Sequence, residues 1–583
     1  MIIRINSLES TIEVFHERYL HLHGFLKLSA EDKKNNKEYT IIVQILNVQT
    51  ISDYIMTRQQ LRNVEISDYI KDLLEMELQY IIQGRPIVCI EKDTKTKKEK
   101  ADIINVFFLI EDLMEKGILK PHTMEVSAVQ SDKAEYLKTI FTPDGIFMGT
   151  LASESNVNVY FPFKFLNYHF FIAGATGSGK SNLNQVFIDG LLQHNANVIM
   201  TGKGKKVSML AIDVHDEYAL GCVEYGIYDI YNAAENNKQL FGKWFYLYPN
   251  KGEPPAELKS MSEPCIMNLQ EIKPEDLFST GTFNDLQVGA VHSAYRDKKE
   301  DFIEYLLDEL YLPPGNHNEK TLAAVRRRLH WLTYSNMFQS KASSKLPKII
   351  KKLEKGQLIV FNVSMISDLE QFLFNSVLAR TLFDLRKALK SSTDFKSFEN
   401  KLERTLPKPF FDIFKLSLPK LYIKAGNKMK DPLDMPVVIF TIEEAPSLLR
   451  PDMMRYSNVF KDISRQGRKF NLALEVISQQ YSPIDDTILS NMNTVINLPL
   501  RSEKEKLIAA KTLGGGIQQS DLDSLTGTRG IGLISAIWLT NFQKLRIALY
   551  DEYFKEVSEK FYENFANIMK NKNPPPPPPT SLP

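Results

Sequence analysis

The sequence has few cysteines, almost no net charge and no long hydrophobic run. Its 583 residues contain three cysteines, Cys89, Cys222 and Cys265, and no two of them are spaced as a Cys-x-x-Cys metal pair. A disulfide framework and a structural zinc site are therefore not expected, which favours a reducing, cytoplasmic compartment. Lys and Arg number 72 against 71 Asp and Glu, a net charge of +1, so any contact with nucleic acid would have to be local.

Two further absences concern membranes. The first residues, Met-Ile-Ile-Arg-Ile-Asn-Ser, contain no long apolar stretch, so we expect no signal peptide. No run approaches the roughly 18 apolar residues that a membrane-spanning helix needs, and the longest candidates, such as 532–539, are about half that length. We therefore expect a soluble chain without a membrane segment.

The first 150 residues predict a strand-rich domain. Residues 39–48 and 86–90 are rich in β-branched side chains. Between them, Ser67 is a candidate N-cap for a helix whose apolar residues recur at helical spacing: Ile70, Leu73, Leu74, Leu78, Ile81 and Ile82. The charged run 92–100 predicts a solvated hairpin loop, with a nucleic-acid patch as the alternative.

From 151 to 570, strands alternate with helices, which is typical of a parallel α/β sheet. Buried strands are predicted at 170–173, 209–214, 357–363, 436–442, 472–478, 494–498 and 532–538. Helices are predicted at 182–192 and within a helical insertion at about 233–355, where 301–310 and 320–332 are amphipathic. The tail 571–583 contains six consecutive prolines and is predicted to be disordered, with docking to a proline-binding partner as the alternative.

The strongest motif is a phosphate-binding loop between strand 170–173 and the helix that follows. It reads Gly-Ala-Thr-Gly-Ser-Gly-Lys-Ser and fits G-x-x-x-x-G-K-[ST]. Its glycines let backbone N–H groups turn toward phosphate oxygens, and the helix N-terminus adds a favourable dipole. Lys180 is expected to reach the β and γ phosphates, and Ser181 to offer its hydroxyl to Mg²⁺. The predicted ligands are ATP and Mg²⁺, and the predicted nucleotide-binding residues are Gly174, Ala175, Thr176, Gly177, Ser178, Gly179, Lys180, Ser181 and Asn182.

Two acidic residues follow the predicted strand 436–442 and supply a candidate Walker B site. The carboxyl ends of parallel strands meet at one edge of the sheet, so Glu443 and Glu444 are expected beside the phosphate-binding loop. Glu443 is predicted to hold Mg²⁺ through water, and Glu444 to orient or deprotonate the attacking water. The alternative is a pair of solvated acids after a core strand.

A third segment follows Walker B in the sequence. Gln479 ends the strand 472–478 and is the candidate sensor of the γ-phosphate. Before that strand, Arg465, Arg468 and Lys469 could supply an arginine finger to the nucleotide of a neighbouring subunit. A solvated basic turn is the equally weighted alternative.

Several weaker patterns in the sequence allow other interpretations. Asp213, His215 and Glu217 alternate and could bind a metal, but a role in positioning water or in coupling to a neighbour is favoured because they follow a parallel strand. The segment 427–431 resembles the guanine-binding N-K-x-D motif of GTPases. Its Asp comes one residue late and it precedes the Walker B strand, so a GTPase is not expected. The basic segments 201–206 and 326–328 could touch phosphates in a channel or form ordinary solvated surface.

Residues 145–555 resemble the HerA/FtsK group of ring ATPases, and the HerA proteins most closely. The segment 167–182 is similar to the family's P-loop region, and 213–218 (Asp-Val-His-Asp-Glu-Tyr) is similar to its D-P-H-G-E-Y. Residues 353–360 resemble the family's helix-Gly-strand segment, which leads from the helical insertion back to the sheet. Further along, 467–470 (Gly-Arg-Lys-Phe), Ser478-Gln479 and 489–494 follow in the family's order.

The resemblance implies a RecA-like P-loop ATPase core behind an N-terminal β-barrel that docks a partner. HerA proteins are hexamers that translocate double-stranded DNA with a partner nuclease, and some relatives work with sirtuin-like partners in anti-phage defence. By position, Arg468 would be the trans-acting finger, with Arg465 second. The sequence departs from the family at Glu443, where Asp is more usual, at Pro446, in 214–218, and in an apparent insertion at 390–435.

The expected function is therefore that of a hexameric ring ATPase that translocates double-stranded DNA and works with a partner nuclease or other effector, in repair or in defence. The alternative is an ATP-regulated scaffold that activates an effector with little DNA pumping. The near-zero net charge and the altered Walker B acid keep that alternative open.

Overall fold

The computed structural model divides the chain into two compact units. One comprises Met1–Pro143, Gly149–Val159 and Ile534–Arg546, and the other Asp144–Met148, Tyr160–Leu533 and Ile547–Pro583. The structure describes residues 2–6, 11–16, 24–50, 80–102, 106–116, 118, 125–128, 141, 144–250, 252–417, 419–424, 428–456, 458–513, 517–539 and 541–572.

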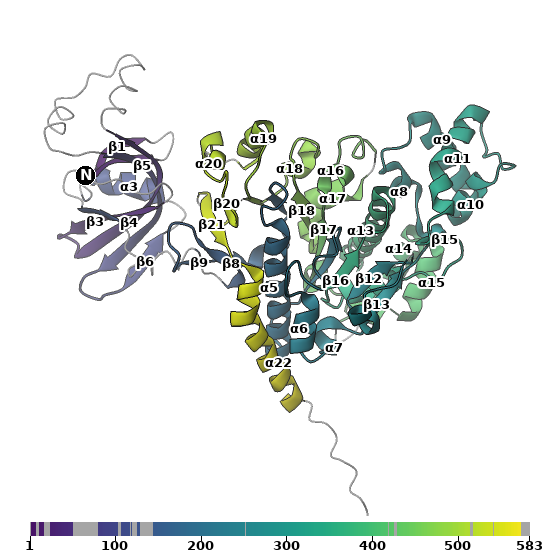
Figure 1. The fold of residues 1–583 in the computed structure, drawn as a ribbon, viewed down its shortest axis with the longest axis horizontal. Helices are drawn as coiled ribbons and strands as arrows, with labels where there is room; N and C mark the ends of the chain where they lie inside the picture. Colours follow the sequence, from purple (N-terminus) through teal and green to yellow (C-terminus); the bar gives the residue numbers. More distant parts are fainter. Residues whose placement is uncertain are drawn as a thin grey trace, which may run out of the picture. The chain divides into compact units, whose positions relative to one another are not determined.

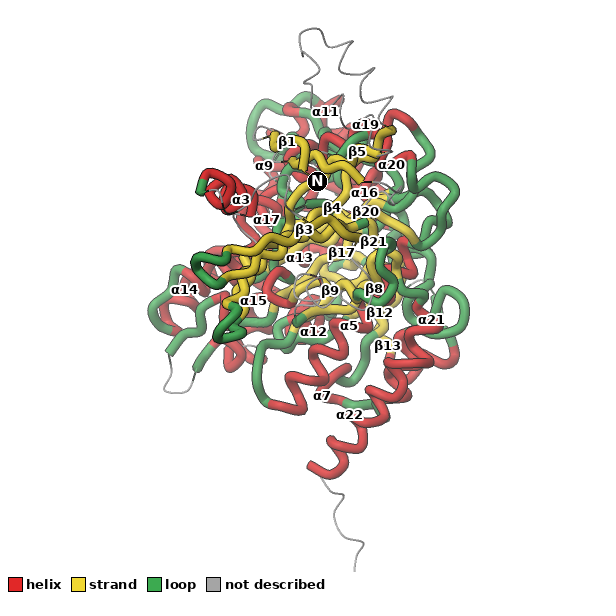
Figure 2. Tube along the Cα trace, turned by 90° about the vertical axis from the view of Figure 1, so that its left-hand side faces the viewer, coloured by secondary structure: helices red, strands yellow, loops and turns green. Residues whose placement is uncertain are grey.

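The N-terminal unit is built on a seven-stranded sheet with antiparallel pairing, as its β-rich sequence predicts (Figure 2). Its strand order is β1-β2-β5-β4-β3-β7, with β6 paired to β5. The strands are β1 (Ile2–Asn6), β2 (Thr11–His16), β3 (Phe25–Asp32), β4 (Lys37–Thr50), β5 (Tyr80–Asp93), β6 (Glu99–Asp102) and β7 (Glu125–Ala128). Helix α3 (Val106–Glu115) packs its apolar residues on the core of this sheet, which includes Ile41 and Ile82.

One prediction for this unit is wrong in part. Ile81 and Ile82, assigned to a helix from their spacing, lie in strand β5 and pair with Phe15 and Val14 of β2. Short apolar runs do not distinguish strand from helix, and pairing with β2 and β4 decides the outcome. Ser67 and the other residues of that predicted helix lie outside the described residues. The charged run 92–100 forms the β5–β6 hairpin, as the solvated-loop interpretation predicts.

The other large sheet is mainly parallel, and its strand order is β13-β12-β16-β11-β17-β18-β10-β19-β20-β21-β8-β9. Pairing from β13 to β19 is parallel throughout, which confirms the α/β core. The strands, in chain order, are β8 (Gly145–Leu151), β9 (Asn158–Pro162), β10 (Phe170–Ala173), β11 (Val207–Asp213), β12 (Tyr246–Pro249), β13 (Ser262–Cys265), β16 (Ile359–Asn362), β17 (Val437–Ile442), β18 (Leu472–Ser478), β19 (Thr494–Asn497), β20 (Ile531–Ala536) and β21 (Gln543–Ile547).

Helices flank this sheet (Figure 1). The helix after the phosphate-binding loop, α5, is longer than predicted, and the C-terminal α22 lies against it, with the Tyr562 hydroxyl donating to Asp189 Oδ1 at 2.8 Å. The principal helices are α5 (Lys180–Thr201), α8 (Pro274–Phe278), α9 (Asp285–Lys298), α10 (Phe302–Leu307), α11 (Glu319–Leu329), α12 (Leu346–Leu353), α13 (Asp368–Lys390), α14 (Phe395–Thr405), α15 (Lys408–Ser417), α17 (Val459–Gln466), α19 (Glu503–Leu513) and α22 (Glu559–Lys572).

The predicted helical insertion is only partly helical. It contains α8 to α11, but also β12 and β13, which extend one edge of the parallel sheet. Both strands are four residues long and contain proline, which is tolerated at sheet edges and obscures the strand pattern in the sequence. The apparent insertion 390–435 contains α14 and α15. Residues 573–583 of the predicted tail lie outside the described residues.

Candidate functional site

The phosphate-binding loop lies at the carboxyl edge of the sheet, between β10 and α5. Gly177 and Gly179 have φ of +74° and +108°, a backbone conformation that favours glycine, and a Cβ at either position would meet no atom within 4 Å. Helix α5 starts at Lys180, its N-cap Gly179 makes no side-chain cap, and its first turn has no acidic residue. The open space and free helix N–H groups fit a polyphosphate.

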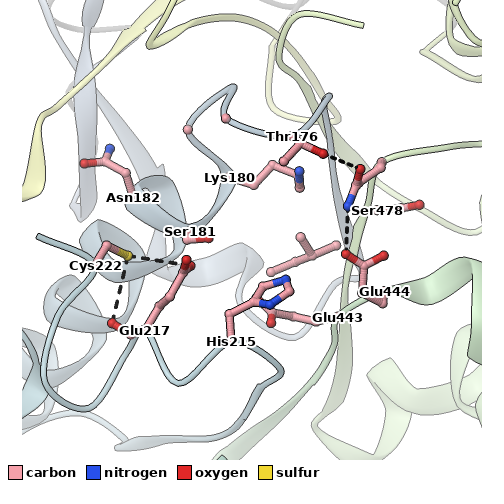
Figure 3. Close-up of a pocket in the computed structure, with 14 residues that line it drawn as sticks. Thr176, Lys180, Ser181, Asn182, His215, Glu217, Cys222, Glu443, Glu444 and Ser478 are labelled. Carbon is pink, nitrogen blue, oxygen red and sulfur yellow. Dashed lines mark hydrogen bonds between the residues drawn. The ribbon is translucent and has the colours of Figure 1, made fainter. Parts of the chain in front are cut away.

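Beside this loop is a cavity of about 420 Å³ (Figure 3). Three segments contribute to it: the P-loop with the start of α5, the loop after β11, and the ends of β17 and β18. Its lining residues are Thr176, Gly177, Gly179, Lys180, Ser181, Asn182, His215, Glu217, Cys222, Glu443, Glu444, Ile477, Ser478 and Gln479. The parallel order of β11, β17, β18 and β10 brings these segments to one edge, as the sequence predicts.

Lys180 lies over its own loop. Its Nζ donates to the carbonyl oxygens of Gly174 at 3.0 Å and Ala175 at 3.2 Å. Burial lowers the pKa of Lys180, while nearby carboxylates act in the opposite direction. A bound phosphate would provide an anionic partner in place of these two neutral acceptors.

Glu444, Gln479 and Thr176 form a chain of hydrogen bonds across the cavity. Gln479 Nε2 donates to Glu444 Oε1 at 2.9 Å, and the Thr176 hydroxyl donates to Gln479 Oε1 at 2.7 Å. Glu444 has φ 47° and ψ 44°, a left-handed conformation that is uncommon for a residue with a side chain. The predicted water-activating acid and the predicted γ-phosphate sensor are therefore in direct contact, and the sensor also contacts the P-loop.

Glu443 has a different environment, although it also contributes to the cavity wall. It is 7% exposed, its Oε1 accepts the hydroxyl of Tyr218, and its Oε2 accepts the backbone N–H of Val214 at 3.3 Å. Burial raises the pKa of Glu443 to about 8, and the Tyr218 hydrogen bond acts in the opposite direction. Tyr218 is a residue that sequence reasoning missed. It was part of the segment 213–218, but only the fold shows that it meets Glu443.

Asp213, His215 and Glu217 do not form one cluster. Asp213 is buried, and its carboxylate accepts the backbone N–H groups of Glu217 and Tyr218, each at 2.9 Å. His215 and Glu217 face the cavity. Among the described residues, no group of three or more His, Cys, Asp or Glu side chains is arranged to hold a metal ion by itself.

The predicted finger residues lie outside this cavity. Arg465, at the end of α17, and Arg468 are exposed, and the Arg468 guanidinium lies 4.1 Å from the ring centroid of Tyr168. Neither belongs to the lining described above.

The basic segments have mainly structural contacts. Arg326 donates to the carbonyl oxygens of Leu306, Glu309 and Tyr311, which fixes α11 on the preceding turn. Lys205 and Lys206 also donate to backbone carbonyl oxygens. In the part of the chain that the structure describes, no helix is long and apolar enough to cross a membrane.

The chain is similar to proteins of known family. Residues 146–382 match the family model "Helicase HerA, central domain". The chain is 24% identical over 416 residues to the DNA double-strand break repair helicase HerA of Saccharolobus solfataricus, covering 71% of this chain and 69% of the relative. It is 22% identical over 466 residues to the protein of the same name from Pyrococcus furiosus, covering 73% of each.

Among solved structures, the unbound monoclinic form of the bacterial conjugative coupling protein TrwBΔN70 is 11% identical. The match covers 71% of this chain and 91% of the TrwBΔN70 chain, with a TM-score of 0.42. The region that matches the family model includes the complete P-loop. Over these residues the chain is similar to the HerA helicases.

Proposed function

We propose that this protein hydrolyses ATP to move double-stranded DNA through a ring of six copies. The observation that carries the proposal is the hydrogen-bonded chain of Thr176, Gln479 and Glu444, which links the phosphate-binding loop to a candidate general base. HerA relatives named as DNA double-strand break repair helicases support the choice of DNA as the substrate.

In this proposal, the P-loop residues 174–182 hold the triphosphate. Backbone N–H groups and the N-terminus of α5 bind the β-phosphate, and Lys180 leaves its carbonyl acceptors to neutralise the β and γ oxygens. Mg²⁺, when bound with the nucleotide, neutralises charge on the phosphates. Ser181 and Glu443 are the residues that the sequence predicts for it, and Glu443 would act through water.

Glu444 orients the attacking water and accepts its proton. Gln479 holds the Glu444 carboxylate and is placed to exchange that hydrogen bond for one to the γ-phosphate, which would link the state of the nucleotide to the position of the base. Such a switch would report hydrolysis to the rest of the subunit through β18.

The positions of Arg468 and Arg465 support the proposed ring. An exposed arginine outside its own nucleotide cavity can stabilise transferred phosphate only at a site between subunits. We propose that Arg468 is the trans-acting finger, and that the N-terminal unit docks a partner effector such as a nuclease. Repair and anti-phage defence both accommodate this arrangement.

The steady-state ATPase rate, with and without linear double-stranded DNA, tests the proposal. Glu444→Gln is the blank, since loss of a general base lowers the rate by about 10²-fold or more while ATP still binds. We expect DNA to stimulate the wild-type rate, and added salt to weaken that stimulation. A normal rate in Glu444→Gln would refute the assignment of the base. A wild-type rate that ignores DNA would refute the motor and favour the ATP-regulated scaffold.

A further inference from the structure

Glu443, at the position where a Walker B acid usually serves Mg²⁺, has both carboxylate oxygens engaged by the protein. Oε1 accepts the Tyr218 hydroxyl, and Oε2 accepts the Val214 N–H. The side chain is 7% exposed. A cation that bound Glu443 directly would have to share oxygens that already accept these hydrogen bonds, on a side chain that the Tyr218 and Val214 contacts hold in place.

Glu217, one residue before Tyr218, has the opposite arrangement: its backbone is fixed and its side chain faces the cavity. Its N–H donates to Asp213 Oδ1 at 2.9 Å, and its carbonyl oxygen accepts Gln185 Nε2 at 3.2 Å. Gln185 lies one helical turn after Ser181 in α5, so this contact ties the loop to the start of that helix.

The Glu217 side chain lies on the same side as the start of α5. In Figure 3 its carboxylate points toward Ser181, and both residues line the same cavity. The Glu217 carboxylate contacts the thiol of Cys222, whose Sγ lies 3.8 Å from Oε2. A thiol is a weak donor and a poor ligand for Mg²⁺, which prefers oxygen, so this contact is easily replaced.

We propose that Glu217 is the carboxylate that helps to hold the nucleotide's Mg²⁺ beside Ser181, and that Glu443 acts through Tyr218 to position the Glu217 loop. This inference rests on the proposed binding of ATP and Mg²⁺. Glu443 is then a positioning residue: it is anchored on β17 and holds Tyr218, whose chain neighbour faces the cation.

Mn²⁺ in place of Mg²⁺ gives a readout that does not depend on turnover. The affinity of Mn²⁺ for the complex of the full chain with ADP is measured by electron paramagnetic resonance. The affinity for fluorescent ADP is measured in EDTA. Three variants are compared with the wild type: Glu217→Gln, Glu443→Gln and, as the matched control, Glu224→Gln. Glu224 lies on the same segment, is exposed and pairs with Lys555.

We expect Glu217→Gln to weaken Mn²⁺ binding by ~10-fold or more, in the range known for losses in metal sites, and to leave ADP binding in EDTA unchanged. Glu443→Gln should weaken Mn²⁺ binding by less than Glu217→Gln does, and Glu224→Gln should leave Mn²⁺ binding unchanged. Glu217→Asp, which keeps the charge on a shorter side chain, should give an intermediate affinity.

The inference is overturned if Glu443→Gln weakens Mn²⁺ more than Glu217→Gln, or if Glu217→Gln lowers ADP affinity equally with and without metal, since that would be a loss of structure. Binding of ADP in EDTA shows that each variant keeps a folded site. If the wild type binds no ADP at all, the proposed function itself fails. If the wild type binds ADP and Mn²⁺ normally and Glu217→Gln does too, only this inference fails.

Discussion

The Glu475→Gln variant should gain stability relative to the wild type as the pH rises. Glu475 lies in β18, between the Walker B strand and the P-loop strand, and is fully buried. Its Oε2 accepts the Thr441 hydroxyl at 2.6 Å, and its Oε1 has no hydrogen-bond partner among the residues that the structure describes. Burial raises the pKa of Glu475 to about 8 from 4.5, and the Thr441 contact acts in the opposite direction.

The sign and size of the effect follow from linkage. The folded state keeps the proton that the unfolded state releases above pH 4.5, so the stabilising contribution of Glu475 is complete below pH 4.5 and is lost as the pH rises to about 8. Between pH 5 and pH 9 this amounts to about 4 kcal/mol, at roughly 1.4 kcal/mol per pKa unit. Glutamine has nearly the shape of the protonated acid and no charge to bury.

The assay is thermal melting of the wild type and Glu475→Gln at pH 5, 7 and 9, with Glu253→Gln, an exposed acid, as control. Other buried acids, including Glu443 and Asp213, titrate in both proteins, so the difference between the two melting temperatures isolates Glu475. The melting temperature of Glu475→Gln should rise relative to that of the wild type from pH 5 to pH 9. A difference that does not change with pH would refute the assignment of Glu475 as a buried, protonated acid.

Three further predictions concern the nucleotide site. Lys180→Ala should weaken ADP binding by about 10- to 150-fold, the value of a charged hydrogen bond of about 1.5–3 kcal/mol, and unchanged affinity would contradict the phosphate role. Gln479→Ala should lower kcat by about 10²-fold with little effect on ADP affinity, and an equal loss of both would indicate a binding role instead. Arg468→Ala should lower kcat by about 10³-fold, and mixing it with Lys180→Ala should restore some activity, because hybrid interfaces regain one complete site. No recovery on mixing would argue for a cis role or for another finger.

The parallel core could be predicted from the sequence because its signals are local. Strand 170–173 is an uninterrupted apolar run, and 472–478 is apolar apart from Glu475 and Ser478; the structure places β10 and β18 at these residues. The P-loop is a contiguous motif, and the acids after 436–442 reach the same edge because parallel strands end together. These features need no knowledge of distant contacts.

The remaining features depend on contacts between distant segments. Tyr218 and Glu443 are 225 positions apart, and no periodicity reveals that they meet. Arg386 is fully buried, and its Nε and Nη2 donate to the Glu354 carboxylate at 2.9 and 2.8 Å, yet its place on α13 gives no sign of a core position. Charged residues are expected at the surface, so a buried pair becomes visible only when both partners are placed.

The glutamate at the Walker B position illustrates how the two kinds of information combine. From the sequence alone, the extra methylene of Glu443 is a departure from the expected Asp with an uncertain consequence. In the structure, β11 and β17 are adjacent parallel strands, and the Glu443 carboxylate reaches across to Tyr218 and Val214 in the loop after β11. An aspartate would be one methylene shorter and would reach less far toward that loop. The longer acid is therefore suited to holding the loop that carries Glu217 and His215. A side chain that the sequence alone suggests is a weakened metal ligand thus connects two walls of the cavity.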